Sequence, residues 1–350
     1  MNELQTIVEL SHEFGTTDYV KGGGGNTSVK DATTLWVKPS GTTLGGLDEK
    51  TFVQMNRTKI NELYAVEPPA EPAAREELVK NRMAAAVEND AGRPSVEAPL
   101  HNVFDAKFVV HTHPALVNGL TCAKDGEAAC KRLWPDALWV EYIDPGYTLC
   151  MEVRKRIEAY KAANGNEPAL LVLQNHGIFV SADTPEEIHA LYARVMDALK
   201  AEYSAAGISQ SLEVPVGEKS TETEAKIQSL FGDDAAFVAS SEMFAYAPGP
   251  ITPDHLVYSK AFPFTAELAE EAVAKYKTER GYAPKVVVAE NCVHGIGTSQ
   301  KNADLALELA QDGALVMQLA AAFGGINYMD DAAREFIENW EVESYRQKQV

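Results

Sequence analysis

The chain has 350 residues, more than one compact domain usually contains, so one large or two smaller hydrophobic cores are expected. Its hydrophobic fraction of 45% and charged fraction of 23% are ordinary for a globular protein and exclude extensive disorder. The formal charge of −20, from 51 acidic and 31 basic residues, repels nucleic acid and anionic membranes, so neither is an expected partner.

The N-terminal sequence MNELQTIVEL lacks the basic flank and apolar core of a signal peptide. No apolar run approaches the ~20 residues that are needed to span a bilayer. A cytoplasmic location is therefore expected. The cysteines are widely spaced and form no CxxC pair, which favours reduced thiols over disulfides or a zinc knot: Cys122, Cys130, Cys150 and Cys292.

The first part of the chain alternates predicted helices and short strands. Helical periodicity is found over residues 4–14 and again over 73–89. Between them, TSVK and TLWVKP indicate two short strands, and further on KFVVHTH and ALLVLQNHGIFV have the composition of buried strands. A long amphipathic helix follows, capped by Asp183 or Thr184 and continuing to about Tyr203.

A domain boundary is predicted after this helix, because residues 204–223 are rich in Ser, Glu, Gly and Pro and have no apolar periodicity. We expect a first domain over 1–210, a linker over 211–223 and a smaller α/β domain over 224–350. In the last of these, AAFVAS and KVVVAE indicate strands, and a helix is expected over 302–322.

Two histidines, His111 and His113, end the apolar run FVV. Alternate side chains of a strand share a face, so both imidazoles can bind one ion, although a pair of surface histidines without a ligand is the simpler alternative. A third, His176, lies in NHG at the end of the run LLVLQ, where a plain turn is again the alternative. Three imidazoles with one open position form the usual catalytic zinc site.

The segment SVEAPLH supplies a carboxylate and another imidazole shortly before the histidine pair. Glu97 can be a fourth ligand or a general base, a role that contributes ~10²–10⁴-fold to rate. In a chain with 51 acidic residues, a solvated surface carboxylate is the alternative. For His101, we expect a structural or supporting role rather than ligation.

The stretch KGGGGNTSVK matches neither the P-loop pattern GxxxxGK[ST] nor the strand and helix context of GxGxxG. Its bare amides and the side chains of Asn26 and Ser28 are available to an oxyanion. A second such turn is formed by Lys38, Pro39, Ser40 and Gly41. On the glycine-rich turns alone, a structural role remains the alternative.

The motifs GGGNTS, KPSG, SVE with its following histidine, HTHP, EYIDPG and NHG, in this order, resemble the class II aldolase and adducin family. That family includes the fuculose-phosphate and rhamnulose-phosphate aldolases. The resemblance covers roughly residues 4–203. It implies an α/β fold with three α/β/α layers around a mostly antiparallel sheet, and a homotetramer with four-fold symmetry.

The resemblance also implies roles for individual residues. His111, His113 and His176 would bind Zn²⁺ or another divalent metal ion. Glu97 would be the catalytic acid and base, and Tyr142 of EYIDPG would protonate the aldehyde oxygen from a neighbouring subunit. The positions that match phosphate-binding residues are Gly25, Asn26, Ser28, Ser40, Gly41 and Ser95.

One position departs from the family pattern. Family aldolases commonly carry Ser-Ser before the glutamate, whereas this chain has Ser95 and Val96. One phosphate-binding hydroxyl is therefore missing, and the sequence leaves open whether the substrate is phosphorylated.

The second region is similar to the part that follows the aldolase unit in rhamnulose-phosphate aldolase/dehydrogenase fusions, notably VVVAENCVHGIGTSQKNADLA and FIENWEVESYRQK. No dehydrogenase is expected in this sequence. Gly295, Ile296 and Gly297 are followed by Gln300, which breaks GxGxxG, so no NAD site is expected. An accessory role in substrate access or assembly is expected for this region.

The expected activity is metal-dependent cleavage of a small sugar substrate, a ketose and commonly a ketose 1-phosphate. In the implied mechanism the metal chelates two adjacent substrate oxygens, Glu97 moves the proton, and Tyr142 protonates the aldehyde. The products would be dihydroxyacetone phosphate, or a similar ketone, and a short aldehyde. Two alternatives remain: a sugar-phosphate epimerase or dehydratase on the same metal scaffold, and a metal-free adducin-like binding module.

Overall fold

A computed structural model describes residues 2–215 and 220–340. The chain forms two compact units. One contains the residues up to Val117 together with Glu127–Leu199, and the other contains Asn118–Gly126 and the described residues from Lys200 onward. The short segment Asn118–Gly126, which lies inside the predicted first domain, thus groups with the second unit.

The described residues do not include all of the predicted linker and second domain. Residues 216–219 of the predicted linker and residues 341–350 of the predicted second domain, including most of FIENWEVESYRQK, lie outside the described residues. Among the helices of the described residues, none is long and apolar enough to cross a membrane.

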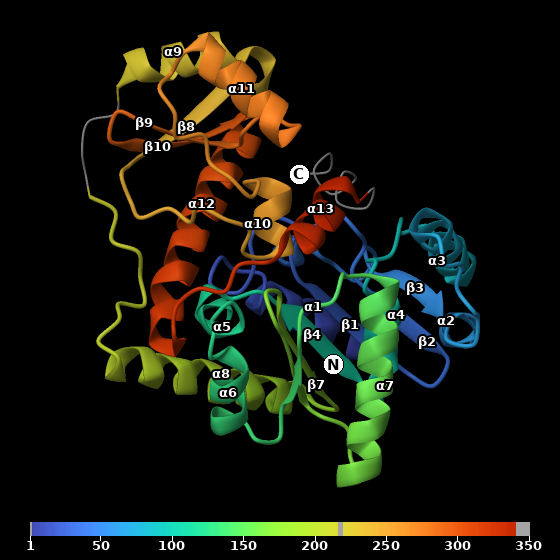
Figure 1. Cartoon of the computed structure of the whole chain (residues 1–350). Coiled ribbons are helices and arrows are strands. Elements are labelled where there is room, and N and C mark those ends of the chain that lie inside the picture. Colours follow the sequence, from blue (N-terminus) through green and yellow to red (C-terminus); the bar gives the residue numbers. More distant parts are fainter. Residues whose placement is uncertain (1, 216–219, 341–350) are drawn as a thin grey trace. The chain divides into compact units, whose positions relative to one another are not determined.

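A seven-stranded sheet forms the centre of the first unit (Figure 1). Five of its six strand pairings are antiparallel and one, between β5 and β6, is parallel, so the prediction of a mostly antiparallel sheet is confirmed. In spatial order the strands are β3 (Val53–Asn56), β2 (Thr34–Val37), β1 (Asn26–Lys30), β4 (Phe108–Thr112), β7 (Gly177–Ala182), β6 (Leu170–Leu173) and β5 (Leu138–Val140).

The apolar run ALLVLQNHGIFV forms two strands rather than one. β6 and β7 pair antiparallel, and the three residues QNH between them, 174–176, make a tight turn. Asn175 has a φ of 52°, in the left-handed region that asparagine tolerates better than most residues. The turn therefore places His176 at the edge of the sheet, next to the end of β4.

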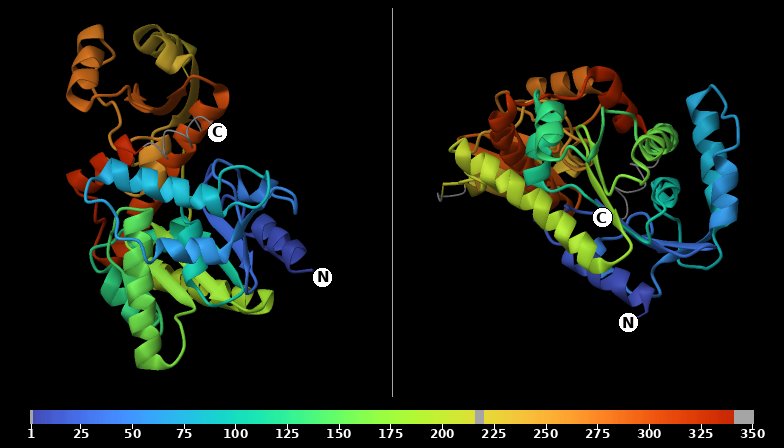
Figure 2. Two further views of the ribbon diagram at one scale, coloured as in Figure 1. Left: turned by 90° about the vertical axis from the view of Figure 1, so that its right-hand side faces the viewer. Right: turned by 90° about the horizontal axis from the view of Figure 1, so that it is seen from below.

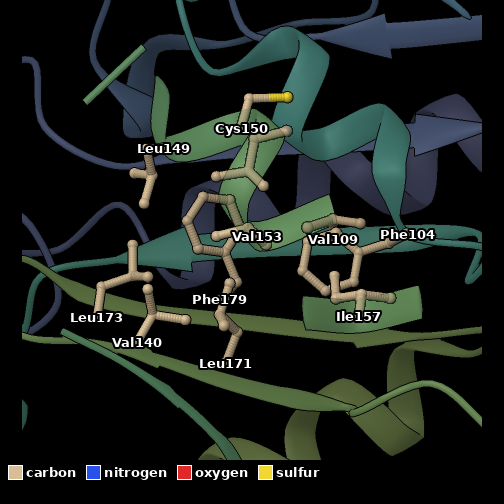
Figure 3. Packing of buried hydrophobic residues seen from close by; sticks show 11 residues of the cluster. Phe104, Val109, Val140, Leu149, Cys150, Val153, Ile157, Leu171, Leu173 and Phe179 are labelled. Atoms are coloured by element: carbon tan, nitrogen blue, oxygen red, sulfur yellow. The ribbon is translucent and has the colours of Figure 1, made fainter. Parts of the chain in front are cut away.

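One face of the sheet is covered by α4 (Ala98–Val103) and α7 (Tyr147–Asn164). In α7, Leu149, Val153 and Ile157 recur every four residues, so they share the face that packs on the sheet. Gly165, in the left-handed conformation, ends this helix. Figure 3 shows the resulting core, which consists of Leu100, Phe104, Val109, Val140, Leu149, Cys150, Val153, Ile157, Leu171, Leu173 and Phe179.

The opposite face carries α1 (Glu3–Glu13) and α8 (Pro185–Ala205), so the unit has the three predicted layers (Figure 2). The ring of Phe14 stacks on Tyr192 of α8 at 4.1 Å between centroids. The Tyr192 hydroxyl lies 2.7 Å from that of Thr112 in β4. Thr184 caps α8 as predicted, because its hydroxyl accepts from the N–H of Glu187 while the Glu187 carboxylate accepts from the N–H of Thr184.

The remaining helices of the first part of the chain are short or peripheral. They are the 3₁₀ turn Leu44–Gly46, α2 (Arg57–Leu63), α3 (Pro72–Ala86), α5 (Ala115–Thr121) and α6 (Gly126–Leu133).

The second unit contains a three-stranded antiparallel sheet in the order β8 (Phe237–Glu242), β10 (Cys292–Gly297) and β9 (Val286–Ala289). Helix α12 (Gln300–Ala320) packs on one face of this sheet, while α9 (Thr221–Phe231) and α11 (Glu270–Arg280) contribute to the core on the other (Figure 1). The unit is therefore α/β, as predicted. Its elements are α9 (Thr221–Phe231), the 3₁₀ turn Gly232–Ala235, β8 (Phe237–Glu242), α10 (Pro253–Tyr258), α11 (Glu270–Arg280), β9 (Val286–Ala289), β10 (Cys292–Gly297), α12 (Gln300–Ala320), the 3₁₀ turn Ala321–Phe323 and α13 (Asp331–Asn339).

The glycines of HGIG belong to β10, where they allow close packing on α12. A Cβ atom at Gly295 would lie 2.2 Å from the carbonyl oxygen of Ala303, and one at Gly297 would lie 2.8 Å from the Ala303 nitrogen. Both distances are shorter than a van der Waals contact, and the backbone atoms of a helix cannot move away to relieve them. Only glycine therefore fits at these two positions.

Candidate metal centre

Three imidazoles meet at one edge of the large sheet. His111 is on β4, His113 follows that strand directly, and His176 lies in the turn between β6 and β7. One nitrogen from each ring lies within 4.8 Å of the others. His111 is fully buried, His176 is 7% exposed, and His113 is partly buried. The structure thus brings together the three histidines that the sequence singled out.

A backbone carbonyl fixes the tautomer of His111. Its Nδ1 lies 2.8 Å from the carbonyl oxygen of Ile178, which can only accept a hydrogen bond. The proton of the neutral ring is therefore on Nδ1, and the Nε2 lone pair is left for another partner. Nε2 of His111 lies 2.9 Å from Nε2 of His113. Two nitrogen lone pairs repel each other at this distance, so either a proton on His113 or a cation lies between the two atoms.

Gly177 makes room for the cluster. A Cβ atom here would lie 2.4 Å from the carbonyl oxygen of Thr112 and 2.7 Å from Cδ2 of His113. The turn that carries His176 can approach β4 this closely only without a side chain.

Glu97 completes the cluster from the start of α4. It is 7% exposed, and its Oε1 lies 3.4 Å from Nε2 of His111 and 3.7 Å from Nε2 of His176. Its other oxygen, Oε2, accepts a hydrogen bond of 2.5 Å from the side-chain amide of Asn26. Burial raises the pKa of the Glu97 carboxyl, but the neighbouring imidazoles lower it by more, so the pKa lies well below its usual range.

These donors fit a divalent metal ion. Three imidazole nitrogens and one carboxylate oxygen are a ligand set that zinc and similar ions prefer. Oε1 of Glu97 is buried and accepts no hydrogen bond from the described residues, although it faces two imidazoles. A buried oxygen in this situation is explained by a cation between it and the rings.

Backbone hydrogen bonds join the segments that carry the candidate anion-binding residues. Lys38 is the link: its N–H donates to the carbonyl of Thr27, and its own carbonyl accepts from the N–H of Ser95. Its buried ammonium group donates to the carbonyl of Gly23 at 3.2 Å. The glycine run, KPSG and SVE therefore lie side by side.

Within this group the candidates differ in their surroundings. Gly41 has a φ of 81°, and the N–H of Ser40 donates to the carbonyl of Arg93. Ser28 is fully buried, and its hydroxyl lies 2.8 Å from Nδ1 of His101. His101 accordingly has the supporting position expected from the sequence, outside the cluster of three imidazoles.

Tyr142 follows β5 at the same edge of the sheet. Because β5 and β6 are parallel, the residues after Val140 and after Leu173 emerge together. The side-chain oxygen of Gln174 accepts from the backbone N–H of Tyr142 at 3.2 Å, and the backbone N–H of Gln174 donates to the carbonyl of Val140. The segment with Tyr142 thus lies beside the turn that carries His176.

A family model described as the Class II Aldolase and Adducin N-terminal domain matches residues 5–203. The chain belongs to this family. The family and the fold expected from the sequence are thereby confirmed for the first part of the chain. The resemblance of the second part to aldolase/dehydrogenase fusions stays a prediction.

Two relatives illustrate the match. The structure of the N-terminal class II aldolase domain of a conserved protein from Thermoplasma acidophilum is 25% identical, has a TM-score of 0.50, and covers 57% of this chain and 93% of that one. The uncharacterized oxidoreductase YuxG of Bacillus subtilis (strain 168) is 27% identical over 194 residues, which is 52% of this chain and 27% of that protein. The chain thus spans little more than a quarter of that curated relative.

Sequence reasoning named Lys38 and Asn26 but missed two contacts through which they shape this site. The contribution of Lys38 to the junction of three loops and the contact of Asn26 with Glu97 both depend on residues far apart in the sequence. For Lys38, the sequence did contain a signal, because a lysine directly precedes the turn-forming residues of KPSG.

Proposed function

We propose that the protein is a metal-dependent aldolase that cleaves a ketose, commonly a ketose 1-phosphate, into dihydroxyacetone phosphate or a similar ketone and a short aldehyde. The observation that carries this proposal is the arrangement of Glu97 against three converging imidazoles. Membership of the class II aldolase and adducin family supports it. A metal-free binding module has no need of such a buried ligand set.

His111, His113 and His176 would hold the metal ion, with Zn²⁺ as the expected ion. When bound, such an ion supplies a Lewis acid that polarises a substrate oxygen. The carbonyl of Ile178 orients one ligand ring, and Gly177 allows another to approach. The protein thereby fixes the ligands before the substrate arrives, which is what preorganisation requires.

Glu97 would move the proton. Its Oε1 is the oxygen that faces the imidazoles, so a carboxylate at this place can exchange a proton with a substrate bound beside the three rings. In cleavage, the substrate hydroxyl whose carbon becomes the aldehyde gives up its proton by the reverse of the step proposed for Tyr142, and Glu97 returns one proton to the ketone carbon. In the reverse direction, the Glu97 carboxylate removes that carbon-bound proton. Both steps need a carboxylate that is held at one place.

The anionic end of the substrate would bind where three loops meet, namely the glycine run, KPSG and SVE. The proposed residues are Gly25, Asn26, Ser28, Ser40, Gly41 and Ser95. The buried ammonium of Lys38 supports an anion at this junction in a chain of charge −20. Because Val96 replaces the second serine of the family pattern, one phosphate-binding hydroxyl is missing. Each phosphorylated sugar is therefore tested together with its unphosphorylated form.

Tyr142 would protonate the aldehyde oxygen in the site of a neighbouring subunit of a homotetramer. The second unit would act as an accessory domain. Mixed tetramers of Tyr142→Phe and Glu97→Gln subunits test the first statement. Each variant is inactive alone, and mixing restores turnover if the two residues act from different subunits. No recovery contradicts the shared site.

Product analysis tests the proposed function. Metal-loaded protein is incubated with a panel of ketose 1-phosphates, pentulose 5-phosphates and their unphosphorylated forms, and the products are identified by NMR and mass spectrometry. A ketone of three carbons together with an aldehyde is the expected result. An epimer or a dehydrated product would contradict cleavage and assign the metal centre to an epimerase or dehydratase.

A further inference from the structure

The two oxygens of the Glu97 carboxylate have different environments. Oε2 accepts the hydrogen bond from the Asn26 amide, whereas Oε1 faces His111 and His176 and accepts no hydrogen bond within the described part of the chain. The carboxylate is therefore held asymmetrically, with one oxygen bound to the protein and the other directed to the imidazoles.

Nothing in the glutamate side chain itself imposes this asymmetry. The last torsion of glutamate is broad and roughly two-fold, so the two oxygens exchange readily when neither is bound. The backbone of Glu97 makes hydrogen bonds of its own, in which its N–H donates to the hydroxyl of Ser95 and its carbonyl accepts from the N–H of His101, and neither of these contacts the carboxylate. A hydrogen bond from an amide to an ionised carboxylate is of the stronger, charge-assisted kind, so Asn26 can select one orientation.

Asn26 is itself fixed relative to a candidate metal ligand. It is the first residue of β1 and the direct cross-strand partner of His111 in β4. The preceding Gly25 has a φ of 69°, and a Cβ atom there would lie 2.8 Å from the carbonyl oxygen of His111. The backbone that carries the amide is thus packed against the backbone that carries the imidazole.

We propose that Asn26 is a positioning residue for Glu97, which presents Oε1 alone to the three imidazoles. This inference rests on the proposed function of the site. It gives Asn26 a role in the geometry of the base, in addition to any contact with the substrate. The hydrogen bond to the carboxylate uses one of the two N–H groups of the Asn26 amide.

The test compares Asn26→Ala with Thr27→Val. Thr27 is the next residue of β1, on the other face, and its hydroxyl lies 2.6 Å from that of Ser11. The control thus removes one buried hydrogen bond from the same strand while Ser11 still donates to Ile7. Asn26→Asp is a second variant of nearly the same shape that lacks the amide donor.

Each protein is loaded with Co²⁺, and its visible absorption spectrum, metal affinity by chelator competition, and thermal unfolding are measured. We expect both Asn26 variants to bind cobalt with an altered spectrum and about 10-fold weaker affinity, as for other residues that orient ligands. The Thr27→Val protein should keep the wild-type spectrum and affinity. A purely structural role would lower the melting temperature of the variants at both positions and leave every spectrum unchanged, which would overturn the proposal.

Kinetics with an active substrate separate positioning from substrate binding. A positioning role predicts that Asn26→Ala lowers kcat by about 10-fold or more with a smaller change in KM. A rise in KM for a phosphorylated substrate, with kcat and the cobalt spectrum unchanged, would show that Asn26 only binds the phosphate and would overturn the proposal. If the wild-type protein cleaves no ketose, the proposed function fails, while the cobalt measurements still decide the role of Asn26.

Discussion

The imidazole of His111 lies flat against the ring of Phe179. Their centroids are 3.8 Å apart and their planes differ by 11°. The two residues are direct cross-strand partners in β4 and β7, and the residue before Phe179 supplies the carbonyl that accepts from Nδ1 of His111. A single strand therefore fixes both the plane and the tautomer of this candidate ligand.

This contact predicts that Phe179→Leu weakens metal binding. Without the flat ring, His111 can tilt about its side-chain torsions, and we expect the affinity for Zn²⁺ to fall about 10-fold. Chelator competition measures the affinity. Phe104→Leu is the matched control, because Phe104 belongs to the same core and stacks on Phe179. Equal affinity losses in both variants would show that general core packing, rather than the ring contact, is responsible.

Glu97 and His113 should separate metal binding from turnover. Glu97→Gln keeps the three imidazoles, so we expect it to retain the metal and to lose ~10²–10⁴-fold in turnover with the loss of the base. His113→Ala removes one of three nitrogen ligands, so it should lose both. Metal content by elemental analysis and turnover by product formation are measured on the same samples. A fully active Glu97→Gln protein would remove Glu97 as the base.

Gly177→Ala should damage the site and the fold together. The new Cβ atom would lie 2.4 Å from the carbonyl oxygen of Thr112, which is part of β4 and cannot move without moving the cluster. We expect the free energy of unfolding to fall by about 2 kcal/mol or more and metal binding to be lost. Urea denaturation and metal content measure the two effects.

Gly45→Ala serves as its control, since a Cβ atom there would approach only the carbonyl oxygen of Gly15, at 3.6 Å. Stability close to wild type is expected for this protein. A Gly177→Ala protein that is as stable and as metal-rich as Gly45→Ala would contradict the tight approach of the turn to β4.

Lys30 should make stability depend on pH. Burial, with a smaller contribution from Arg57, lowers the pKa of Lys30 to about 7, compared with about 10.4 in an unfolded chain. Between these values the unfolded chain binds more protons, so the contribution of Lys30 to stability rises with pH through this window. Below about pH 7 the cost of burying the charge is present in full.

The corresponding variant is Lys30→Met, which removes the charge. The advantage of the variant over wild type in free energy of unfolding should therefore shrink as pH increases from 7 to 9, by up to about 1.4 kcal/mol per pH unit. The side chain of Lys30 donates to the carbonyl of His101, so the variant also loses one hydrogen bond, but that loss does not vary with pH. Urea denaturation at each pH gives the difference. A difference that is constant with pH would contradict a lowered pKa.

Local patterns in the sequence were sufficient for many elements. Periodicity predicted α1 and α8, and of the two caps predicted for α8, Asp183 and Thr184, the structure has Thr184. The spacing of His111 and His113 predicted that both rings share one face of a strand, and the structure brings their nitrogens together.

Contacts between distant residues could not be predicted in this way. Whether Phe179 lies against His111 depends on strand register, and whether Asn26 reaches Glu97 depends on the packing of α4 against the sheet. Single-sequence patterns contain neither. The spacing of the glycines in HGIG shows only that they do not complete a nucleotide-binding motif, whereas the structure shows that Gly295 allows a strand to pack closely on a helix.

The central claim is that Glu97, next to a metal held by three histidines, exchanges a proton with a ketone. Every aldolase of the proposed kind shares this step, whatever aldehyde it releases. The most direct measurement follows, by NMR in D₂O, the exchange of the hydroxymethyl hydrogens of dihydroxyacetone phosphate, and of dihydroxyacetone, with solvent. We predict that the metal-loaded protein exchanges one of the two enantiotopic hydrogens of the hydroxymethyl carbon. No exchange is expected with Glu97→Gln or after removal of the metal. Absence of exchange in the metal-loaded protein with both ketones, or equal exchange in Glu97→Gln, would contradict the account.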